Sequence, residues 1–274
     1  ESRGDPFDLV TKLLEPLLVD QPNGDKVPFT SGIMGYFGYD LGRRYHRIAP
    51  SRQSITTLPD MRVGRYLWAL LVDHEEKTVQ LHFHALCPNA LKNKIVKIFL
   101  SESPISSGDD SQRFSCEPFS AQISKSQYID NLEKISRYIH AGDCYQVNFA
   151  QHFYSQYSGD SYHAYRALRR AIPSPYSAYW QWRDVSIMSL SPERFLRVQG
   201  DDVETKPIKG TIERGKTRDH DRQNAEALIN SEKDRAENLM IVDLLRNDLG
   251  KNAQIGSVAV PKLFDLETFP NVHH

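Results

Sequence analysis

A glutamate and a lysine flank a short hairpin in the second half of the chain. A run typical of a buried strand, residues 185–190, leads through Ser191-Pro192-Glu193-Arg194-Phe195 into a short strand. A turn at Gly200-Asp201-Asp202 follows, and a second strand leads to Lys209. Because strands joined by a tight turn run antiparallel, Glu193 and Lys209 are expected to approach each other. A carboxyl group facing an amine suits general acid–base catalysis or a lysine nucleophile. The alternative, an ordinary surface ion pair, is favoured by the pattern alone.

Two further carboxylates lie near the start of a predicted helix. Ser231 and Asp234 have the spacing of a helix N-cap and its partner in the first turn. Asp234 and Glu237 share one helix face, and Glu237 also shares a face with apolar Ile241. Carboxylates beside an apolar patch favour a cation site. The alternative is that these acids complement the positive end of the helix dipole.

Three motifs together resemble the chorismate-utilising enzymes. They are Ser191-Pro192-Glu193-Arg194-Phe195, Pro207-Ile208-Lys209-Gly210-Thr211, and the run Asp234 to Asp248, DRAENLMIVDLLRND. The branch of this family that forms 4-amino-4-deoxychorismate has lysine at the position of Lys209, whereas anthranilate-forming members usually have alanine. Gln146 stands where isochorismate- and salicylate-forming members typically place a lysine, which again resembles the ammonia-using branch.

The resemblance implies an enzyme that replaces the C4 hydroxyl of chorismate with an amine on the route to 4-aminobenzoate and folate. The ammonia would come from a glutamine amidotransferase partner. In this chemistry Lys209 adds covalently at C2 while Glu193 protonates the departing hydroxyl. The residues expected to bind the substrate are Gly210, Thr211 and His274. We also expect a closed, largely apolar pocket, since a salt bridge between Glu193 and Lys209 would hold each in its unreactive protonation state.

Two further ligands are implied by the resemblance. Glu237 matches a glutamate that binds Mg²⁺ in the family. It is expected to point into the same cavity as Glu193 and Lys209, with Asp234 beside it. The second glutamate of the family's metal site would lie after His274. Pro175-Tyr176-Ser177 matches a contact through which family members bind tryptophan, as an inhibitor or a structural ligand.

The expected fold is α+β, with mostly antiparallel sheets and helices packed on their outer faces. The resemblance implies an anthranilate-synthase-like two-subdomain β-sandwich, incomplete here. Residues 1–120 would form a partial N-terminal region and 121–274 the N-terminal part of the chorismate-binding domain, with a Ser-, Pro-, Asp- and Gly-rich linker at 101–120.

Local patterns place the individual elements of this fold. Helices are expected from Asp5-Pro6, over 126–141, 160–171 and 219–230, and from Ser231. Strands are expected over 66–73, 77–84, 144–149, 178–182, 185–190 and 255–261. The helices from Ser126 and Ser231 should cover sheet faces, and the glycines within 32–42 should permit close backbone packing in a sheet. His82 and His84 lie two residues apart and could form half a metal site. Because no third ligand is nearby in the sequence, a solvated strand face is the favoured interpretation.

Composition excludes several classes of protein. Hydrophobic residues at 39% and charged residues at 25% are globular values. The formal net charge of −1 gives no electrostatic case for nucleic acid or an anionic membrane. No apolar run approaches the ~20 residues that span a bilayer, and Glu1-Ser2-Arg3-Gly4-Asp5 does not resemble a signal peptide. Three scattered cysteines favour reduced thiols and a cytoplasmic protein.

Two alternatives to the 4-amino chemistry stay open. The nearer is anthranilate synthase component I, which Lys209 disfavours. The other is a non-enzymatic module that docks an amidotransferase. We interpret the chain as a piece cut at both ends, and we expect residues 1–274 alone to be inactive. The reason is that the family's glycine-rich segment for the chorismate carboxylates comes later in the sequence.

Overall fold

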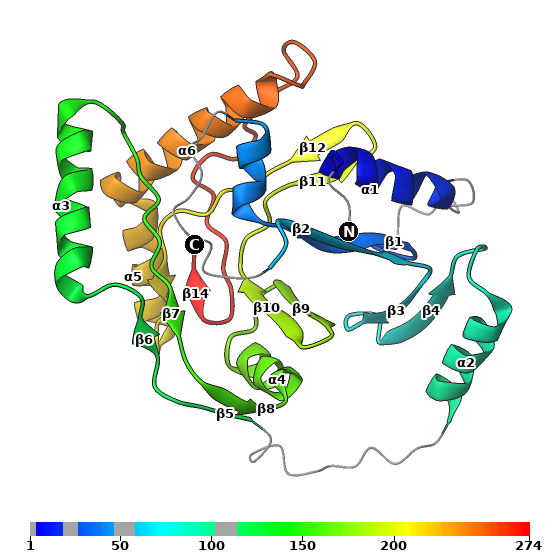
Figure 1. Cartoon of the computed structure of the whole chain (residues 1–274). Coiled ribbons are helices and arrows are strands. Elements are labelled where there is room, and N and C mark those ends of the chain that lie inside the picture. Colours follow the sequence, from blue (N-terminus) through cyan, green and yellow to red (C-terminus); the bar gives the residue numbers. More distant parts are fainter. Residues whose placement is uncertain (1–3, 19–26, 47–57, 102–113) are drawn as a thin grey trace. The chain divides into compact units, whose positions relative to one another are not determined.

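The computed structural model describes residues 4–18, 27–46, 58–101 and 114–274 (Figure 1). It divides the chain into two compact units, Glu1–Ser106 and Ser107–His274, so the boundary expected at residue 120 falls inside the second unit. Every strand pair in the described ranges is antiparallel, and helices occur before, between and after these pairs in the chain. The prediction of an α+β fold with antiparallel sheets is therefore confirmed.

Among its described residues, the first unit contains two pairs of strands and two α-helices. Its elements are α1 (Pro6–Leu14), η1 (Glu15–Leu17), β1 (Gly32–Phe37), η2 (Tyr39–Arg44), β2 (Met61–Tyr66), β3 (Trp68–Asp73), β4 (Thr78–Phe83) and α2 (Asn89–Leu100). The Asp5 carboxylate accepts backbone N–H groups at the start of α1, so the predicted cap is confirmed. Close packing of β1 on β2 is also confirmed, because a Cβ at Gly35 would overlap the carbonyl oxygen of Arg62.

The predicted solvated face of β4 is wrong at His84. Only 6% of this residue is exposed, and it lies just after the end of β4. Its Nε2 donates to the carbonyl oxygen of Leu17 at 3.3 Å, while Nδ1 accepts the N–H of Leu86 at 3.1 Å. Nδ1 acts as the acceptor, which fixes the tautomer. His84 is therefore a core residue, buried because the end of β4 packs against η1.

Over residues 114–274, which the structure describes, the second unit contains five strand pairs and four helices. Its elements are β5 (Phe114–Cys116), β6 (Ser120–Ala121), α3 (Lys125–Ala141), β7 (Phe153–Tyr154), β8 (Tyr157–Gly159), α4 (Ser161–Ala171), β9 (Tyr176–Trp182), β10 (Val185–Ser191), β11 (Arg197–Gln199), β12 (Asp202–Glu204), β13 (Ile212–Glu213), α5 (Arg218–Ile229), α6 (Glu232–Gly250) and β14 (Val272–His273). The predicted strands at 144–149 and 255–261 are wrong, since both segments are irregular. Neither pairs with a strand in the described ranges, and a strand needs a neighbour to bond its backbone groups. Of the expected linker, residues 102–113 lie outside the described ranges.

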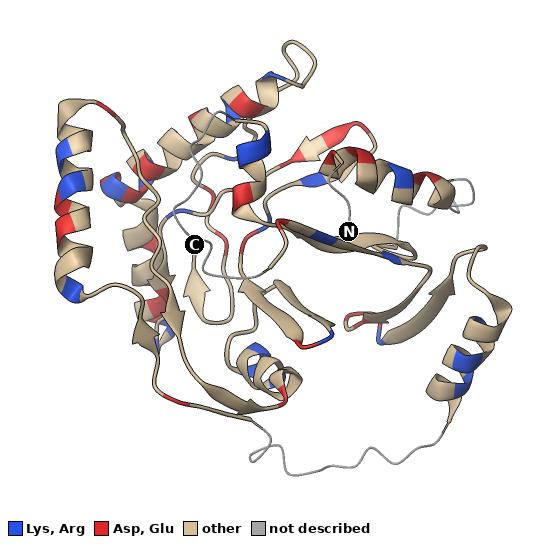
Figure 2. Ribbon diagram, in the orientation of Figure 1, with Lys and Arg blue, Asp and Glu red and all other residues tan. Residues whose placement is uncertain are grey.

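Helix packing differs between the four helices of this unit. The hydroxyl of Ser161 in α4 bonds Tyr179 in β9 at 3.0 Å and Ser186 in β10 at 2.9 Å, and Tyr165 is 7% exposed. Helix α4 therefore covers the β9–β10 hairpin. By contrast, α3 and α6 contain no buried residue and carry both signs of charge (Figure 2). The prediction that these two helices cover sheet faces is therefore wrong.

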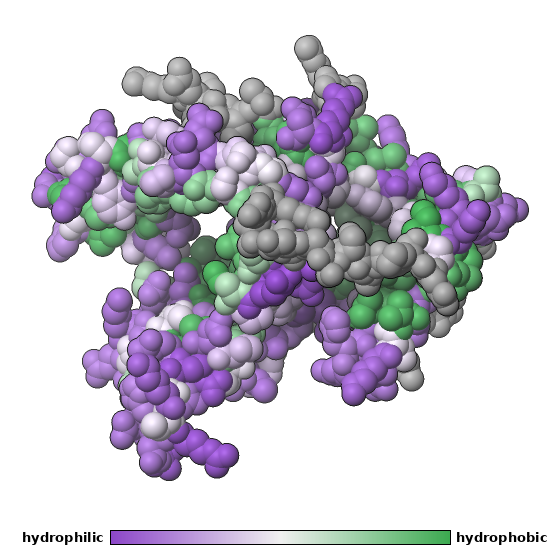
Figure 3. All heavy atoms as spheres, turned by 90° about the horizontal axis from the view of Figure 1, so that it is seen from below, coloured by the Kyte–Doolittle hydropathy of each residue, from purple (hydrophilic) through white to green (hydrophobic). Residues whose placement is uncertain are grey.

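Apolar side chains remain at the surface of both units. Leu132 on α3 is 42% exposed, Leu239 on α6 is 51% exposed, and Phe99 on α2 is 48% exposed. Hydrophobic residues reach the surface at several separate places on the face drawn in Figure 3. The apolar side chains of α3 and α6 are therefore partly exposed to solvent.

Candidate active site

Folding of the β11–β12 hairpin brings Glu193 next to the lysine segment. Arg194 donates to the carboxylate of Glu204 at 2.6 Å and so closes the base of the hairpin. The carboxylate oxygen Oε1 of Glu193 then accepts the backbone N–H of Ile208 at 3.1 Å. Since Ile208 precedes Lys209, the predicted approach of the two ends of the hairpin is confirmed.

Lys209 forms its ion pair with helix α6. Its Nζ lies 3.8 Å from Oε1 of Glu237, with the two side chains 25% and 41% exposed. Glu237 therefore lies beside Lys209, as predicted. No ion pair joins Glu193 to Lys209 in the part of the chain that the structure describes. The Glu193 carboxylate instead contacts the backbone N–H of the residue before Lys209.

Gly210 lets the backbone after Lys209 pass close to helices α5 and α6. Its φ of +71° lies in the left-handed region. A Cβ there would come within 2.9 Å of Leu228 Cδ1 and within 3.2 Å of the carboxyl carbon of Asp234. Asp234 is placed by its helix cap, since its N–H donates to the hydroxyl of Ser231 at 3.3 Å. Asp234 therefore lies against the segment that carries Lys209.

Substituting alanine at Gly210 should destabilise the protein for two reasons. The left-handed backbone costs a non-glycine residue about 1–2 kcal/mol, and the new methyl group would also press on Leu228 and Asp234. Gly200→Ala is the matched control, because Gly200 has a φ of +58° but no atom within 4 Å of its added Cβ. Urea denaturation of both variants measures the free energies of unfolding. Equal losses in the two variants would show that the packing of Gly210 on α5 and α6 contributes nothing.

Thr211 and His274 meet although 63 residues separate them. The hydroxyl of Thr211 lies 2.8 Å from Nδ1 of His274, and the ring of Phe269 contacts the His274 ring edge-on at 5.4 Å. Pairing of β13 with β14 sets this contact, since Ile212 lies opposite His273. The three residues expected to bind the substrate, Gly210, Thr211 and His274, thus come from one region.

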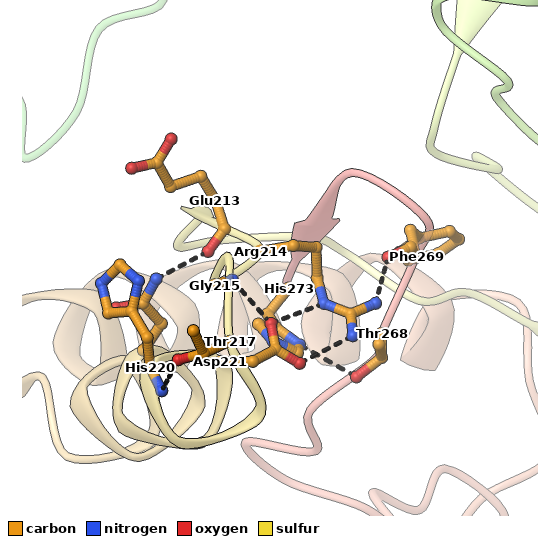
Figure 4. A network of polar contacts seen from close by, with 10 residues as sticks. Glu213, Arg214, Gly215, Thr217, His220, Asp221, Thr268, Phe269 and His273 are labelled. Atoms are coloured by element: carbon orange, nitrogen blue, oxygen red, sulfur yellow. Dashed lines mark hydrogen bonds and ion pairs between the residues drawn. The ribbon is translucent and has the colours of Figure 1, made fainter.

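A polar network beside this region was not predicted from the sequence (Figure 4). Arg214 donates to both carboxylate oxygens of Asp221, at 2.8 and 2.7 Å, and the N–H of Gly215 donates to Oδ1 at 2.7 Å. Nε2 of His273 donates to the same oxygen at 3.0 Å, while its Nδ1 accepts from the Thr268 hydroxyl at 2.9 Å. His273 is only 3% exposed. The network fixes the start of α5 to both strands of the β13–β14 pair.

The charge of Asp221 is stabilised by these donors. The hydrogen bonds from Arg214, then that from the Gly215 N–H, and to a lesser degree that from His273, hold the pKa of the Asp221 carboxyl far below its usual 3.8, against the effect of burial. The same contact raises the pKa of Arg214. The sequence signal was an arginine and an aspartate on either side of the N-cap Thr217, which indicates a bonded pair only once the turn is formed.

Acid should weaken the fold through Asp221. Its folded pKa lies below its unfolded value near 3.8, so its stabilising contribution is complete above that pH and is lost as the pH falls towards the folded pKa. The thermal unfolding midpoint of the wild type should therefore drop more steeply below pH 3.8 than that of Asp221→Asn. Asp219→Asn, which alters an 89% exposed side chain on the same helix, is the control. Parallel profiles of the wild type and Asp221→Asn would contradict this prediction.

The residues expected to bind tryptophan lie at the start of β9. Tyr176 is 41% exposed and pairs with Ser191, directly before the segment of Glu193. The Arg194 guanidinium lies 5.9 Å from the Tyr176 ring centroid, and the Ser177 hydroxyl donates to the Ser174 carbonyl. Pro175 is exposed. Tryptophan binding by Pro175, Tyr176 and Ser177 stays a prediction.

The expected closed, apolar pocket does not form from the described residues. Glu193 and Thr211 are exposed, although the Glu193 carboxylate accepts the backbone N–H of Ile208. The described ranges also hold no group of three or more His, Cys, Asp or Glu residues arranged to bind a metal ion. Glu237 and Asp234 thus supply two nearby carboxylates but not a third metal ligand among the described residues.

All three cysteines are free of disulfide bonds. No described helix is both long and apolar enough to span a membrane.

The sequence model of the chorismate binding enzyme family matches residues 3–274. The chain therefore belongs to this family, as the three motifs indicate. It is 41% identical over 270 residues to aminodeoxychorismate synthase component 1 of Escherichia coli (strain K12), a match that covers 98% of this chain and 58% of that protein. It is 32% identical over 284 residues to anthranilate synthase component 1 of Bacillus pumilus, covering 97% of this chain and 55% of that protein. The chain thus spans less than two thirds of the length of these relatives.

The fold is shared with a solved structure of the same family. The crystal structure of anthranilate synthase component I from Streptococcus pneumoniae TIGR4 matches with a TM-score of 0.83 at 25% identity. The match covers 99% of this chain and 61% of that chain. The predicted anthranilate-synthase-like fold is therefore confirmed.

Proposed function

We propose that the full-length protein converts chorismate and ammonia into 4-amino-4-deoxychorismate. The observation that carries this proposal is the lysine of Pro207-Ile208-Lys209-Gly210-Thr211, which contacts Glu237 at 3.8 Å and follows the residue whose N–H binds Glu193. Anthranilate-forming members usually have alanine at this position. The similarity to aminodeoxychorismate synthase component 1 over nearly the whole chain supports the same assignment. Because the relatives are longer, the activity is proposed for the full-length protein.

The proposed reaction uses a lysine nucleophile and a carboxylic acid. Nζ of Lys209, without its ammonium proton, forms a bond to C2 of chorismate. The ring double bonds shift, the C4–O bond breaks, and Glu193 gives its proton to the hydroxyl, which leaves as water. Ammonia then bonds to C4 and passes a proton back to Glu193. The double bonds return, and the bond from C2 to Nζ breaks to release the lysine amine.

Glu237 is proposed to hold Lys209 before the reaction and Mg²⁺ during it. The Glu237 carboxylate lies 3.8 Å from Nζ of Lys209, so this ion pair must open before the amine can bond to chorismate. Carboxylates of the type that Glu237 and Asp234 provide suit Mg²⁺, which takes one or two protein carboxylates and completes its shell with water and substrate oxygens. The bound ion would neutralise Glu237 and a substrate carboxylate.

Glu237→Gln in the full-length protein should increase the Mg²⁺ concentration needed for half-maximal activity by about tenfold or more. The amide keeps the size of the side chain but loses the charge that attracts the ion. Asp243→Asn changes an 80% exposed carboxylate on the same helix and serves as the control. Titration of chorismate turnover with Mg²⁺ measures the effect. Identical titrations of the wild type and Glu237→Gln would remove Glu237 from the metal site.

Product identification tests the proposed function as a whole. The full-length protein is incubated with chorismate, Mg²⁺ and ammonium, and the product is identified by NMR. The expected product is 4-amino-4-deoxychorismate. Glutamine should replace ammonium only after a glutamine amidotransferase subunit is added, which tests the proposed partner. Anthranilate as the product would contradict the regiochemistry, and chorismate recovered unchanged would favour a docking module without catalysis.

A further inference from the structure

The last described residues form a tight hairpin that ends at His274. The N–H of His274 donates to the carbonyl oxygen of Glu267, and the N–H of Glu267 donates to the carbonyl oxygen of His274, both at 2.9 Å. The N–H of Phe269 donates to the carbonyl oxygen of Val272 at 2.8 Å. The hairpin 267–274 therefore presents the imidazole of His274 to the Thr211 hydroxyl at 2.8 Å.

Three anchors fasten this hairpin to Arg214 and Asp221. The guanidinium of Arg214 donates to the Phe269 carbonyl oxygen at 2.9 Å (Figure 4), and its backbone N–H donates to the Asn271 carbonyl oxygen at 3.2 Å. His273 provides the third anchor through its hydrogen bond to Asp221 at 3.0 Å. The anchors thus lie on both strands of the hairpin and at its turn.

We propose that Arg214, Asp221 and His273 form a positioning clamp that orients His274 and Thr211 towards a substrate held beside Lys209. The part of this proposal that concerns the substrate rests on the proposed function above. The part that concerns the hairpin rests on contacts within this chain alone.

Backbone pairing between the strands is too short to hold the hairpin by itself. Strands β13 and β14 each contain two residues, and isolated two-stranded pairs are at best marginally stable in water. The bidentate contact of Arg214 with Asp221 supplies a fixed planar geometry, and the burial of His273 leaves little room for movement. Thr211 is two residues from Lys209, so a displaced hairpin would move His274 relative to the amine. Displacements near 1 Å in an active site can cost about a hundredfold in rate.

Hydrogen exchange of the full-length protein tests the clamp without chorismate. In Asp221→Asn, the amide hydrogens of Phe269 and His274 should exchange about tenfold or more faster than in the wild type, because hydrogen bonds to a charged group are lost. Asp219→Asn, on the same helix, should leave them unchanged. Unchanged exchange in Asp221→Asn would overturn the clamp. Exchange in peptides of α4 and the β9–β10 hairpin shows whether the variant has lost its fold as a whole. If it has, His273→Gln takes its place.

Kinetic coupling tests whether the clamp serves the reaction. His273→Ala and Thr211→Val should each lower kcat/KM for chorismate by about tenfold or more. The kcat/KM of the double variant should be no lower than that of the less active single variant. His273→Gln, which keeps an N–H donor, should recover part of the loss. Fully additive effects would show that His273 does not act through the Thr211–His274 contact. If the wild type itself turns over no chorismate, the proposed function fails, while hydrogen exchange still decides the clamp.

Discussion

Lys209→Ala in the full-length protein is expected to form the 4-amino product roughly a hundredfold or more slowly than the wild type, because the substitution removes the covalent nucleophile. The substitution removes Nζ, the atom that is proposed to bond to C2 of chorismate. No other described lysine occupies its position against Glu237. Lys262→Ala is the control, because Lys262 is 75% exposed and pairs with Asp265 outside the site. The measurement is the rate of product formation with saturating ammonium, so that ammonia supply does not limit the reaction.

The residual chemistry of Lys209→Ala should shift from C4 to C2. Removing the side chain leaves space next to C2, so ammonia can attack there directly, which is the regiochemistry of the anthranilate-forming members that usually have alanine at this position. The ratio of 2-amino to 4-amino product, measured by NMR, should therefore rise relative to the wild type. Residual product that is purely 4-amino, formed at nearly the wild-type rate, would reduce Lys209 to an electrostatic role.

Glu193→Gln should suppress both products by about 10²–10⁴-fold, the usual contribution of a general acid. The amide oxygen can still accept the Ile208 N–H, so the local geometry is retained while the acid is lost. Both regiochemical outcomes need the C4 hydroxyl to leave, and both should therefore fail. Glu133→Gln, on the exposed surface of α3, is the control.

Combining the two substitutions separates the roles of the two residues. Adding Glu193→Gln to Lys209→Ala should remove the residual 2-amino product as well. Survival of that product would mean that another group protonates the leaving hydroxyl.

The parts of the fold set by local chemistry were predictable from the sequence. The turn at 200–202 between two short strands predicted the hairpin that brings Glu193 to Ile208. Helix caps at Asp5 and Ser231 were predicted because side chains of these types bond backbone groups only two or three residues away. The position of Glu237 beside Lys209 was inferred from the family motifs instead.

The features that depend on distant partners were not predictable in this way. His273 reaches Asp221 across 52 residues, and His84 is buried because it bonds Leu17, 67 residues away. The segment 144–149 has the apolar alternation of a strand but no partner strand in the described ranges, so alternation alone gave the wrong element. In each case the outcome depends on which other segment packs alongside.

The most direct test of the central claim is mass spectrometry of the full-length wild-type enzyme, mixed with chorismate and Mg²⁺ without ammonia and then quenched. Covalent catalysis by Lys209 predicts that the peptide containing it gains the mass of chorismate less one water, and that the Lys209→Ala protein carries no adduct at this site. An unmodified Lys209 peptide, together with near-normal 4-amino product from Lys209→Ala, would contradict the account.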